Sequence, residues 1–211
     1  SYNKGLTMIA VIDYGVGNLF SLAASLRYIG AESVVTADEK VINSASSVIL
    51  PGVGAFADAK KKLDSCGLIP VLKRQVSEGK PVLGICLGMQ LLFDKSFEYG
   101  EHEGLGFIRG EVRPIAYDLK EKLKVPHMGW NSLQIKRPSP LFRYISDGDY
   151  VYFVHSYYAA NCAESVTATS FYGGLELTAS AERENVFGTQ FHPEKSGATG
   201  LKILRAFSEI K

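Results

Sequence analysis

Short apolar runs alternate with amphipathic segments through the first half of the chain. Runs typical of buried β-strands occupy residues 8–12, 33–35, 47–50 and 81–85. Apolar residues at helical spacing mark a helix over 19–30 after a capping Asn18, and we also predict helices over 55–65, over 69–78 and over an apolar segment from 87 through Phe93. This alternation of strands and helices predicts a mainly parallel sheet that is covered by helices on both faces.

The second half changes character, because turn-rich stretches join its strand-like segments. These segments are 107–115, 133–135, 150–154, 166–171, 177–181 and 186–191. We expect them to add an antiparallel extension to the sheet. A helix from about Ser196 closes the chain, with Leu201, Leu204 and Phe207 on its apolar face. The whole pattern predicts a three-layer α/β fold.

Composition narrows the classes of function. The chain has 211 residues, of which 46% are hydrophobic, and its 23 Lys+Arg against 22 Asp+Glu leave a net charge of +1. Balanced charge argues against binding of nucleic acids or anionic membranes. No run approaches the ~20 apolar residues of a membrane span, and the N-terminus lacks the pattern of a signal peptide. We therefore expect a cytoplasmic protein with one domain over residues 8–211, and interpret residues 1–7 as a remnant of recombinant expression before a native start at Met8.

Of the three cysteines, only Cys86 lies in a motif that suggests chemistry. Cys66, Cys86 and Cys162 lack Cys-x-x-Cys spacing, so we expect neither a disulfide scaffold nor a metal, and no cofactor. Gly84-Ile85-Cys86-Leu87-Gly88 has the Gly-x-Cys-x-Gly layout of a nucleophile elbow between a strand and a helix. The glycines leave room for close neighbours, and a helix N-terminus favours a thiolate. The alternative is a buried structural cysteine.

A cysteine nucleophile needs a base, and His192 is the best candidate among the four histidines. It follows an apolar strand, which Pro193 forces to end or to lie at a sheet edge. Residues two apart in an extended chain point the same way, so Glu194 shares a face with His192 and can orient the imidazole. The pattern predicts a Cys86–His192–Glu194 triad if the fold brings the two segments together; otherwise His192 and Glu194 form a surface pair.

Acyl transfer by a thiol also needs hydrogen-bond donors for a tetrahedral oxyanion. The Leu87 N–H comes directly after the candidate nucleophile and is the first candidate donor. The loop 51–54 (PGVG), which follows a predicted strand, could supply a second. Residues 13–18 contain Gly-x-Gly after the first strand, but Phe20 replaces the third glycine of a dinucleotide fingerprint. The sequence therefore disfavours nucleotide binding at this loop.

Six blocks in order along the chain resemble the class I, or triad, glutamine amidotransferases. They are 12–18 (IDYGVGN), 51–56 (PGVGAF), 84–90 (GICLGMQ), 126–131 (PHMGWN), 152–157 (YFVHSY) and 190–196 (QFHPEKS). The cysteine and His-Pro-Glu blocks are general to that family. The first and fourth blocks are similar to the glutaminase subunits of imidazole glycerol phosphate synthases, from histidine biosynthesis. The resemblance implies a flavodoxin-like glutamine amidotransferase domain over residues 8–211.

The resemblance also implies an activity, namely hydrolysis of L-glutamine to glutamate and ammonia through a γ-glutamyl thioester on Cys86. It implies that the backbone amides of Val53 and Leu87 bind the oxyanion and that the glutamine is contacted by Gly52, Gln90, Ser156 and Tyr157. In similar enzymes the amide that corresponds to Val53 is turned away until the partner binds its own substrate, which suppresses wasteful hydrolysis.

The implied partner is a separate cyclase chain, a (β/α)8 barrel, which uses the ammonia to make imidazole glycerol phosphate and an aminoimidazole carboxamide ribotide. The resemblance implies a heterodimer interface at a short loop and one lysine, namely His127, Met128, Trp130, Asn131 and Lys195. Without the resemblance, a lone Trp is more often a core residue. Two other classes stay open: another Cys-elbow enzyme, such as a peptidase or a different amidotransferase subunit, and a non-catalytic binding or regulatory subunit.

Overall fold

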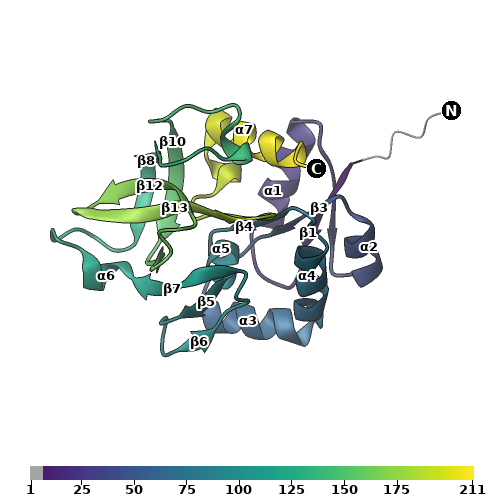
Figure 1. Ribbon diagram of the computed structural model, residues 1–211, viewed down its shortest axis with the longest axis horizontal. Helices are drawn as coiled ribbons and strands as arrows, with labels where there is room; N and C mark the ends of the chain where they lie inside the picture. Colours follow the sequence, from purple (N-terminus) through teal and green to yellow (C-terminus); the bar gives the residue numbers. More distant parts are fainter. Residues whose placement is uncertain (1–6) are drawn as a thin grey trace.

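An eight-stranded sheet organises the fold in the computed structural model, which describes residues 7–211 (Figure 1). In spatial order its strands are β2 (Glu32–Thr36), β1 (Met8–Ile12), β3 (Ser47–Leu50), β4 (Val82–Ile85), β14 (Val186–Thr189), β13 (Leu175–Arg183), β12 (Val166–Tyr172) and β9 (Gln134–Ile135). The first five strands are parallel, and the last three add antiparallel pairs. This confirms the predicted parallel sheet with its antiparallel extension.

Helices cover both faces of this sheet because its strands alternate their buried side chains. In β1, Ile9 and Val11 pack with helices α1 (Leu19–Tyr28) and α7 (Gly197–Ser208). Ala10 and Ile12 point the other way. They pack with α2 (Glu39–Ser44), α3 (Phe56–Ser65), α4 (Leu68–Ser77) and α5 (Leu87–Leu91). Figure 1 shows α1 and α7 on one side and α3 and α4 on the other, which confirms the three layers.

The chain between β4 and β14 builds two smaller sheets as well. One has four strands in the order β11 (Tyr157–Ala160), β7 (Ile108–Pro114), β5 (Phe93–Ser96) and β6 (His102–Glu103), and the other pairs β10 (Tyr150–His155) with β8 (His127–Ser132). The short helix α6 (Ile115–Asp118) and the 3₁₀ turn η1 (Pro140–Phe142) lie in the connections. The segments predicted at 107–115 and 150–154 therefore form separate sheets and do not extend the main one.

Local predictions differ from the structure at α2, at the end of α5 and at β8, among other places. The sequence does not predict α2, a six-residue helix in which only Ile42 is buried. The helix predicted through Phe93 ends at Leu91, because the chain then pairs with β7; its uniformly apolar sequence has no periodicity to mark that end. Residues 126–131, predicted as a loop from Gly129 and Asn131, instead form most of β8, since each residue of this strand pairs with one of β10.

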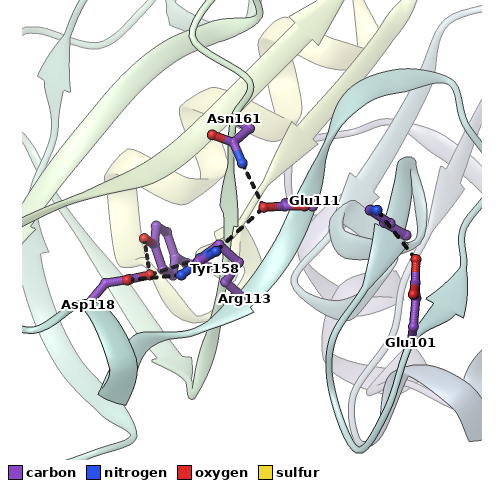
Figure 2. A network of polar contacts seen from close by, with 7 residues as sticks. Glu101, Glu111, Arg113, Asp118, Tyr158 and Asn161 are labelled. Carbon is purple, nitrogen blue, oxygen red and sulfur yellow. Dashed lines mark hydrogen bonds and ion pairs between the residues drawn. The ribbon is translucent and has the colours of Figure 1, made fainter.

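A network of polar contacts ties β11 to β7 and α6 (Figure 2). Glu111 accepts a hydrogen bond from Asn161 at 2.6 Å and lies 3.6 Å from the Arg113 guanidinium. Arg113 donates twice to Asp118 at 3.1 Å, and Asp118 accepts from the Tyr158 hydroxyl at 2.7 Å. The hydrogen bonds from Arg113 hold the pKa of the Asp118 carboxyl below its usual range. These contacts fix β11 at the edge of its sheet.

The structure bears on only part of the predictions about residues 1–7 and about membrane spans. Of residues 1–7, interpreted above as an expression remnant, all but Thr7 lie outside the described residues. Within residues 7–211, none of the helices combines the length and the apolar character that crossing a bilayer requires.

Candidate active site

Strands β4 and β14 lie side by side and run parallel, so both end at the same edge of the sheet. Gly84 pairs with Gly188, and Ile85 pairs with Thr189. The Cys86 N–H then donates to the Thr189 carbonyl at 2.8 Å. The fold therefore brings Cys86 beside the segment that carries His192, although the two are far apart in the sequence.

Cys86 occupies a sharp turn between β4 and α5. Its φ of 55° and ψ of −113° are rare for a residue with a side chain. Close contacts explain the flanking glycines: a Cβ on Gly84 would lie 2.6 Å from the Gly88 carbonyl oxygen, and a Cβ on Gly88 would lie 1.9 Å from that of Leu50. The segment thus has the backbone geometry of a nucleophile elbow.

His192 and Glu194 form a buried pair. Nδ1 of His192 lies 2.6 Å from Oε1 of Glu194, and their side chains are only 3% and 4% exposed. The 3₁₀ turn η2 (Pro193–Lys195), rather than the predicted extended chain, brings them together. Pro193 suits its first position, where a backbone N–H has no partner within the turn. The shared face predicted from the sequence is present, but it is reached through a tighter turn.

The charge state of His192 depends on both of its neighbours. Burial alone lowers the pKa of His192, but hydrogen bonding and charge interactions with Cys86 and Glu194 outweigh burial and raise this pKa to about 9. Nε2 of His192 is buried and meets no oxygen or nitrogen at hydrogen-bond distance within residues 7–211. Cys86 lines the same cavity as His192, so its sulfur is the candidate for proton exchange with Nε2.

A cavity of about 450 Å³ opens over Cys86, which suits a ligand the size of an amino acid. Its lining includes the candidate residues Val53, Cys86, Leu87, Gln90, Ser156, Tyr157, His192 and Lys195. Gly52 does not line it but lies directly behind the wall, where a Cβ would come within 2.8 Å of the Tyr14 hydroxyl. The fold thus gathers the predicted nucleophile, base and substrate residues around one cavity.

The two predicted oxyanion donors are not brought together in this conformation. The Leu87 N–H donates to the Gly52 carbonyl at 3.3 Å. Because the C=O and N–H of a trans peptide point in opposite directions, the Val53 N–H points away from Leu87. The Gly52 carbonyl oxygen therefore occupies the position that the hypothesis assigns to the oxyanion, and the second predicted donor faces away from it.

Tyr14 gives the 13–18 block a role in supporting this loop. The Tyr14 hydroxyl donates to the Pro51 carbonyl at 2.6 Å. A Cβ on Gly17 would meet the Pro51 ring at 3.2 Å, so the glycine allows the two loops to touch. The block therefore supports residues 51–54.

The sequence motifs do not predict two polar residues at the cavity, Glu98 and Gln190. Glu98 lines it near Tyr99, and burial raises the pKa of its carboxyl. No motif marks Glu98. Gln190 is fully buried, and its Nε2 lies 3.7 Å from Sγ of Cys86. Its position two residues before His192 is a signal that could have pointed to it.

The candidate interface residues separate into exposed and buried groups along β8. Met128 and Trp130 are 64% and 56% exposed, whereas His127 is 3% exposed and lies beneath that surface. Asn131 is half-buried, and Lys195 is exposed at the rim of the cavity. An exposed apolar surface therefore lies on β8. This strand forms a two-stranded ribbon with β10, and β10 ends at the cavity.

A directed chain of hydrogen bonds links β8 to the cavity. Nδ1 of His155 lies 2.8 Å from the Tyr157 carbonyl and must donate, so its Nε2 accepts from Nδ1 of His127 at 2.8 Å. Nε2 of His127 then accepts from the Asn131 amide at 3.2 Å. Burial lowers the pKa of His127 to about 4 and that of His155 to about 3, so both imidazoles are neutral at pH 7.

The described residues hold no group of three or more His, Cys, Asp and Glu side chains that could bind a metal ion. The side chains at this site offer a thiol and an imidazole that line one cavity, a carboxylate paired with the imidazole, and further polar groups around the cavity.

Known proteins are similar to this chain over nearly its whole length. The family model described as glutamine amidotransferase class-I matches residues 10–209. A Geobacter sulfurreducens protein named imidazole glycerol phosphate synthase subunit HisH is 49% identical over 209 residues, which cover 98% of this chain and 100% of the relative. A Caldanaerobacter subterraneus protein of the same name is 50% identical over 204 residues, covering 96% and 98%.

Solved structures agree on the fold. A crystal structure of a glutamine amidotransferase superposes with a TM-score of 0.72 at 18% identity and covers 94% of this chain and 96% of its own. PurLQS from Thermotoga maritima superposes with a TM-score of 0.72 at 19% identity, covering 95% and 96%. These similarities support the three-layer fold described above.

Proposed function

The chain belongs to the class I glutamine amidotransferase family, and we propose that it hydrolyses L-glutamine as the glutaminase subunit of an imidazole glycerol phosphate synthase. The observation that carries this proposal is the Cys86–His192–Glu194 cluster in its cavity, in a chain about half identical to subunits of that name. The product ammonia passes to a separate cyclase subunit for histidine biosynthesis. The free thiols suit a reducing compartment, so we propose a cytoplasmic location.

The reactive form is a thiolate on Cys86 beside an imidazolium on His192: Sγ has given up its proton, and the pKa of about 9 keeps a proton on Nε2 at neutral pH. The thiolate attacks the side-chain amide carbon of glutamine, and the imidazolium returns the proton to the departing nitrogen, which releases ammonia and leaves a γ-glutamyl thioester. His192 then takes a proton from water as the water attacks the thioester. Glutamate leaves, and Cys86 is restored.

Glu194 acts on His192 and does not touch the substrate. Its carboxylate accepts a hydrogen bond from the Nδ1–H of His192 at 2.6 Å. This bond keeps the proton on Nδ1 of the neutral imidazole and orients the ring so that Nε2 faces Cys86. It also stabilises the imidazolium that each step forms. Because the pair is buried, solvent does not screen this interaction.

Recognition of glutamine follows from the charges and donors around the cavity. The Glu98 carboxylate matches the α-ammonium group of a free amino acid, and Lys195 offers a cation to the α-carboxylate. Nε2 of Gln90 already donates to the Tyr157 carbonyl and to Gln190, so its Oε1 is the atom that can accept from the ligand. Ser156 and Tyr157 complete the wall.

Partner binding and catalysis are coupled at the loop 51–54. The Gly52 carbonyl must leave the Leu87 N–H before an oxyanion can bind there, and rotation of the Gly52–Val53 peptide replaces this carbonyl with the Val53 N–H. Gly54, at a φ of 98°, gives the loop conformational freedom beside this peptide. We propose that the cyclase drives this rotation when it holds its own substrate.

The cyclase docks on the ribbon of β8 and β10 in this proposal. Met128 and Trp130 offer exposed apolar side chains there, and the Trp130 ring contacts Tyr152 at 6.0 Å between centroids. The Tyr152 carbonyl accepts from the His192 N–H at 3.1 Å. A partner that covers Trp130 would therefore contact the β8–β10 ribbon, and β10 is the strand that is hydrogen-bonded to the backbone of His192.

The test is the rate of glutamate release from glutamine by the purified chain, alone and with a cyclase subunit that holds its ligand. We expect slow hydrolysis alone and much faster hydrolysis in the complex. Equal rates would contradict the coupling, and no glutamate release in either sample would overturn the proposed activity.

A further inference from the structure

Gln190 places a buried amide against the candidate nucleophile. The side chain is 0% exposed, and its Nε2 lies 3.7 Å from Sγ of Cys86. Within residues 7–211 the thiol of Cys86 also donates to the Val154 carbonyl at 3.9 Å. Gln190 takes no part in the proton transfers proposed for Cys86, His192 and Glu194.

The direction of this amide is set by a backbone carbonyl two steps away. The Tyr157 carbonyl can only accept, so Nε2 of Gln90 donates to it at 3.2 Å. The same Nε2 donates to Oε1 of Gln190 at 3.1 Å. A flipped Gln190 would set two NH₂ groups against each other. An N–H of Gln190, and not its oxygen, therefore faces the sulfur.

The two contacts of Cys86 respond differently when the thiol loses its proton. The thiol has then given up the hydrogen that it donated to Val154, and a carbonyl oxygen facing a negative sulfur is unfavourable. The N–H of Gln190 instead gains strength, because hydrogen bonds to ionised acceptors are about twice as strong as neutral ones. The surroundings therefore hold a donor that favours the ionised sulfur.

We propose that Gln190 is a further catalytic residue, which donates a hydrogen bond to the Cys86 thiolate and directs the sulfur toward the cavity while His192 carries the proton. Gln90 and the Tyr157 carbonyl act through Gln190 as positioning groups. The inference rests on the proposed function only in that Cys86 is the nucleophile.

Alkylation by iodoacetamide tests this without glutamine turnover, because the thiolate is the species that reacts. The rate of Cys86 modification is followed by peptide mass spectrometry from pH 5 to 10, and the exposed Cys66 in the same sample is an internal reference. Gln190→Met removes the donor and keeps the side-chain length. Gln190→Glu keeps an oxygen that accepts from Gln90 and sets a carboxyl at the sulfur. Gln75→Met is the matched control, because Gln75 is also 0% exposed but bonds to Asn43.

We expect the pH midpoint of Cys86 alkylation to rise by about one unit in Gln190→Met and further in Gln190→Glu, with no change in Gln75→Met or at Cys66. In the cyclase complex, kcat for glutamine should fall about tenfold in Gln190→Met with little change in KM. An unchanged Cys86 midpoint in both Gln190 variants would overturn the proposal, even if thermal stability fell. A wild-type chain that alkylates normally but hydrolyses no glutamine would overturn the proposed function instead.

Discussion

The Leu87 N–H donates to the Gly52 carbonyl at 3.3 Å, so the position at which an oxyanion would bind is filled by the protein's own backbone. The nucleophile elbow, the base and the cavity are otherwise assembled. The slow hydrolysis that we predict for the isolated chain therefore follows from one peptide orientation, without any misplacement of Cys86 or His192.

Replacing Val53 by proline tests whether this peptide supplies the second oxyanion donor. Proline has no N–H, so a rotated Gly52–Val53 peptide would stabilise the intermediate less well. We expect partner-stimulated glutamine hydrolysis to fall by about 100-fold or more. Val53→Ala is the control and should stay near wild type, because the Val53 side chain is 41% exposed. Equal rates in the two variants would show that this N–H has no part in catalysis.

Stability at alkaline pH tests the environment of His192. Its pKa is about 9 in the folded chain and about 6.5 when unfolded, so the native state binds the extra proton between these values. The stabilisation is complete below pH 6.5 and is lost as pH rises through 9. In His192→Gln, the free energy of unfolding from urea titrations should therefore decline less between pH 6.5 and 9. An unchanged decline, matching that of a His102→Gln control on β6, would contradict this assignment.

The buried pair His127 and His155 predicts the opposite trend in acid. Their folded pKa values of about 4 and about 3 lie below the unfolded value of about 6.5, so the unfolded chain binds more protons as pH falls. Stability should fall as pH falls from 6.5 to 4. In His127→Gln this slope should lessen by about 1.4 kcal/mol per pH unit, measured by urea unfolding. A slope equal to wild type would mean that His127 titrates normally in the folded chain.

Truncation of Trp130 tests the docking surface. Aromatic anchors dominate many interfaces, so Trp130→Ala should weaken binding to the cyclase by about tenfold or more in calorimetry. Tyr28→Ala is a matched control, because Tyr28 is 80% exposed at the end of α1 opposite to the cavity. The account of the ribbon would be wrong if both variants bound the cyclase like wild type.

Physical reasons explain which parts of this molecule the sequence predicts. The bounds of β1 and β3 are predicted as observed, since unbroken apolar runs are typical of buried parallel strands. The strand β8 is not predicted, because Gly129 and Asn131 are typical of loops and its pairing with β10 is non-local. The sequence likewise does not predict that β7 and β10 leave the main sheet.

The sequence also predicts some residues of the candidate site and not others. Cys86 and His192 can be proposed from short motifs, because elbow glycines and a His-Pro-Glu turn leave local signatures. Glu98 and Gln190 can be assigned to the site only from tertiary contacts. Glu98 follows β5 and lines the cavity, and Gln190 is oriented by its hydrogen bond with Gln90. The occupied oxyanion position depends on one peptide's orientation, which residue types do not specify.

The most direct test of the account is synthesis of imidazole glycerol phosphate by the complex of the cyclase with a Cys86→Ala chain. With glutamine as nitrogen donor, we expect no detectable product, because the thioester cannot form. With ammonium salts, we expect synthesis near the wild-type rate, because the cyclase receives ammonia without Cys86. Product formed from glutamine by this variant, or loss of synthesis from both donors, would contradict the assignment of Cys86 as the nucleophile.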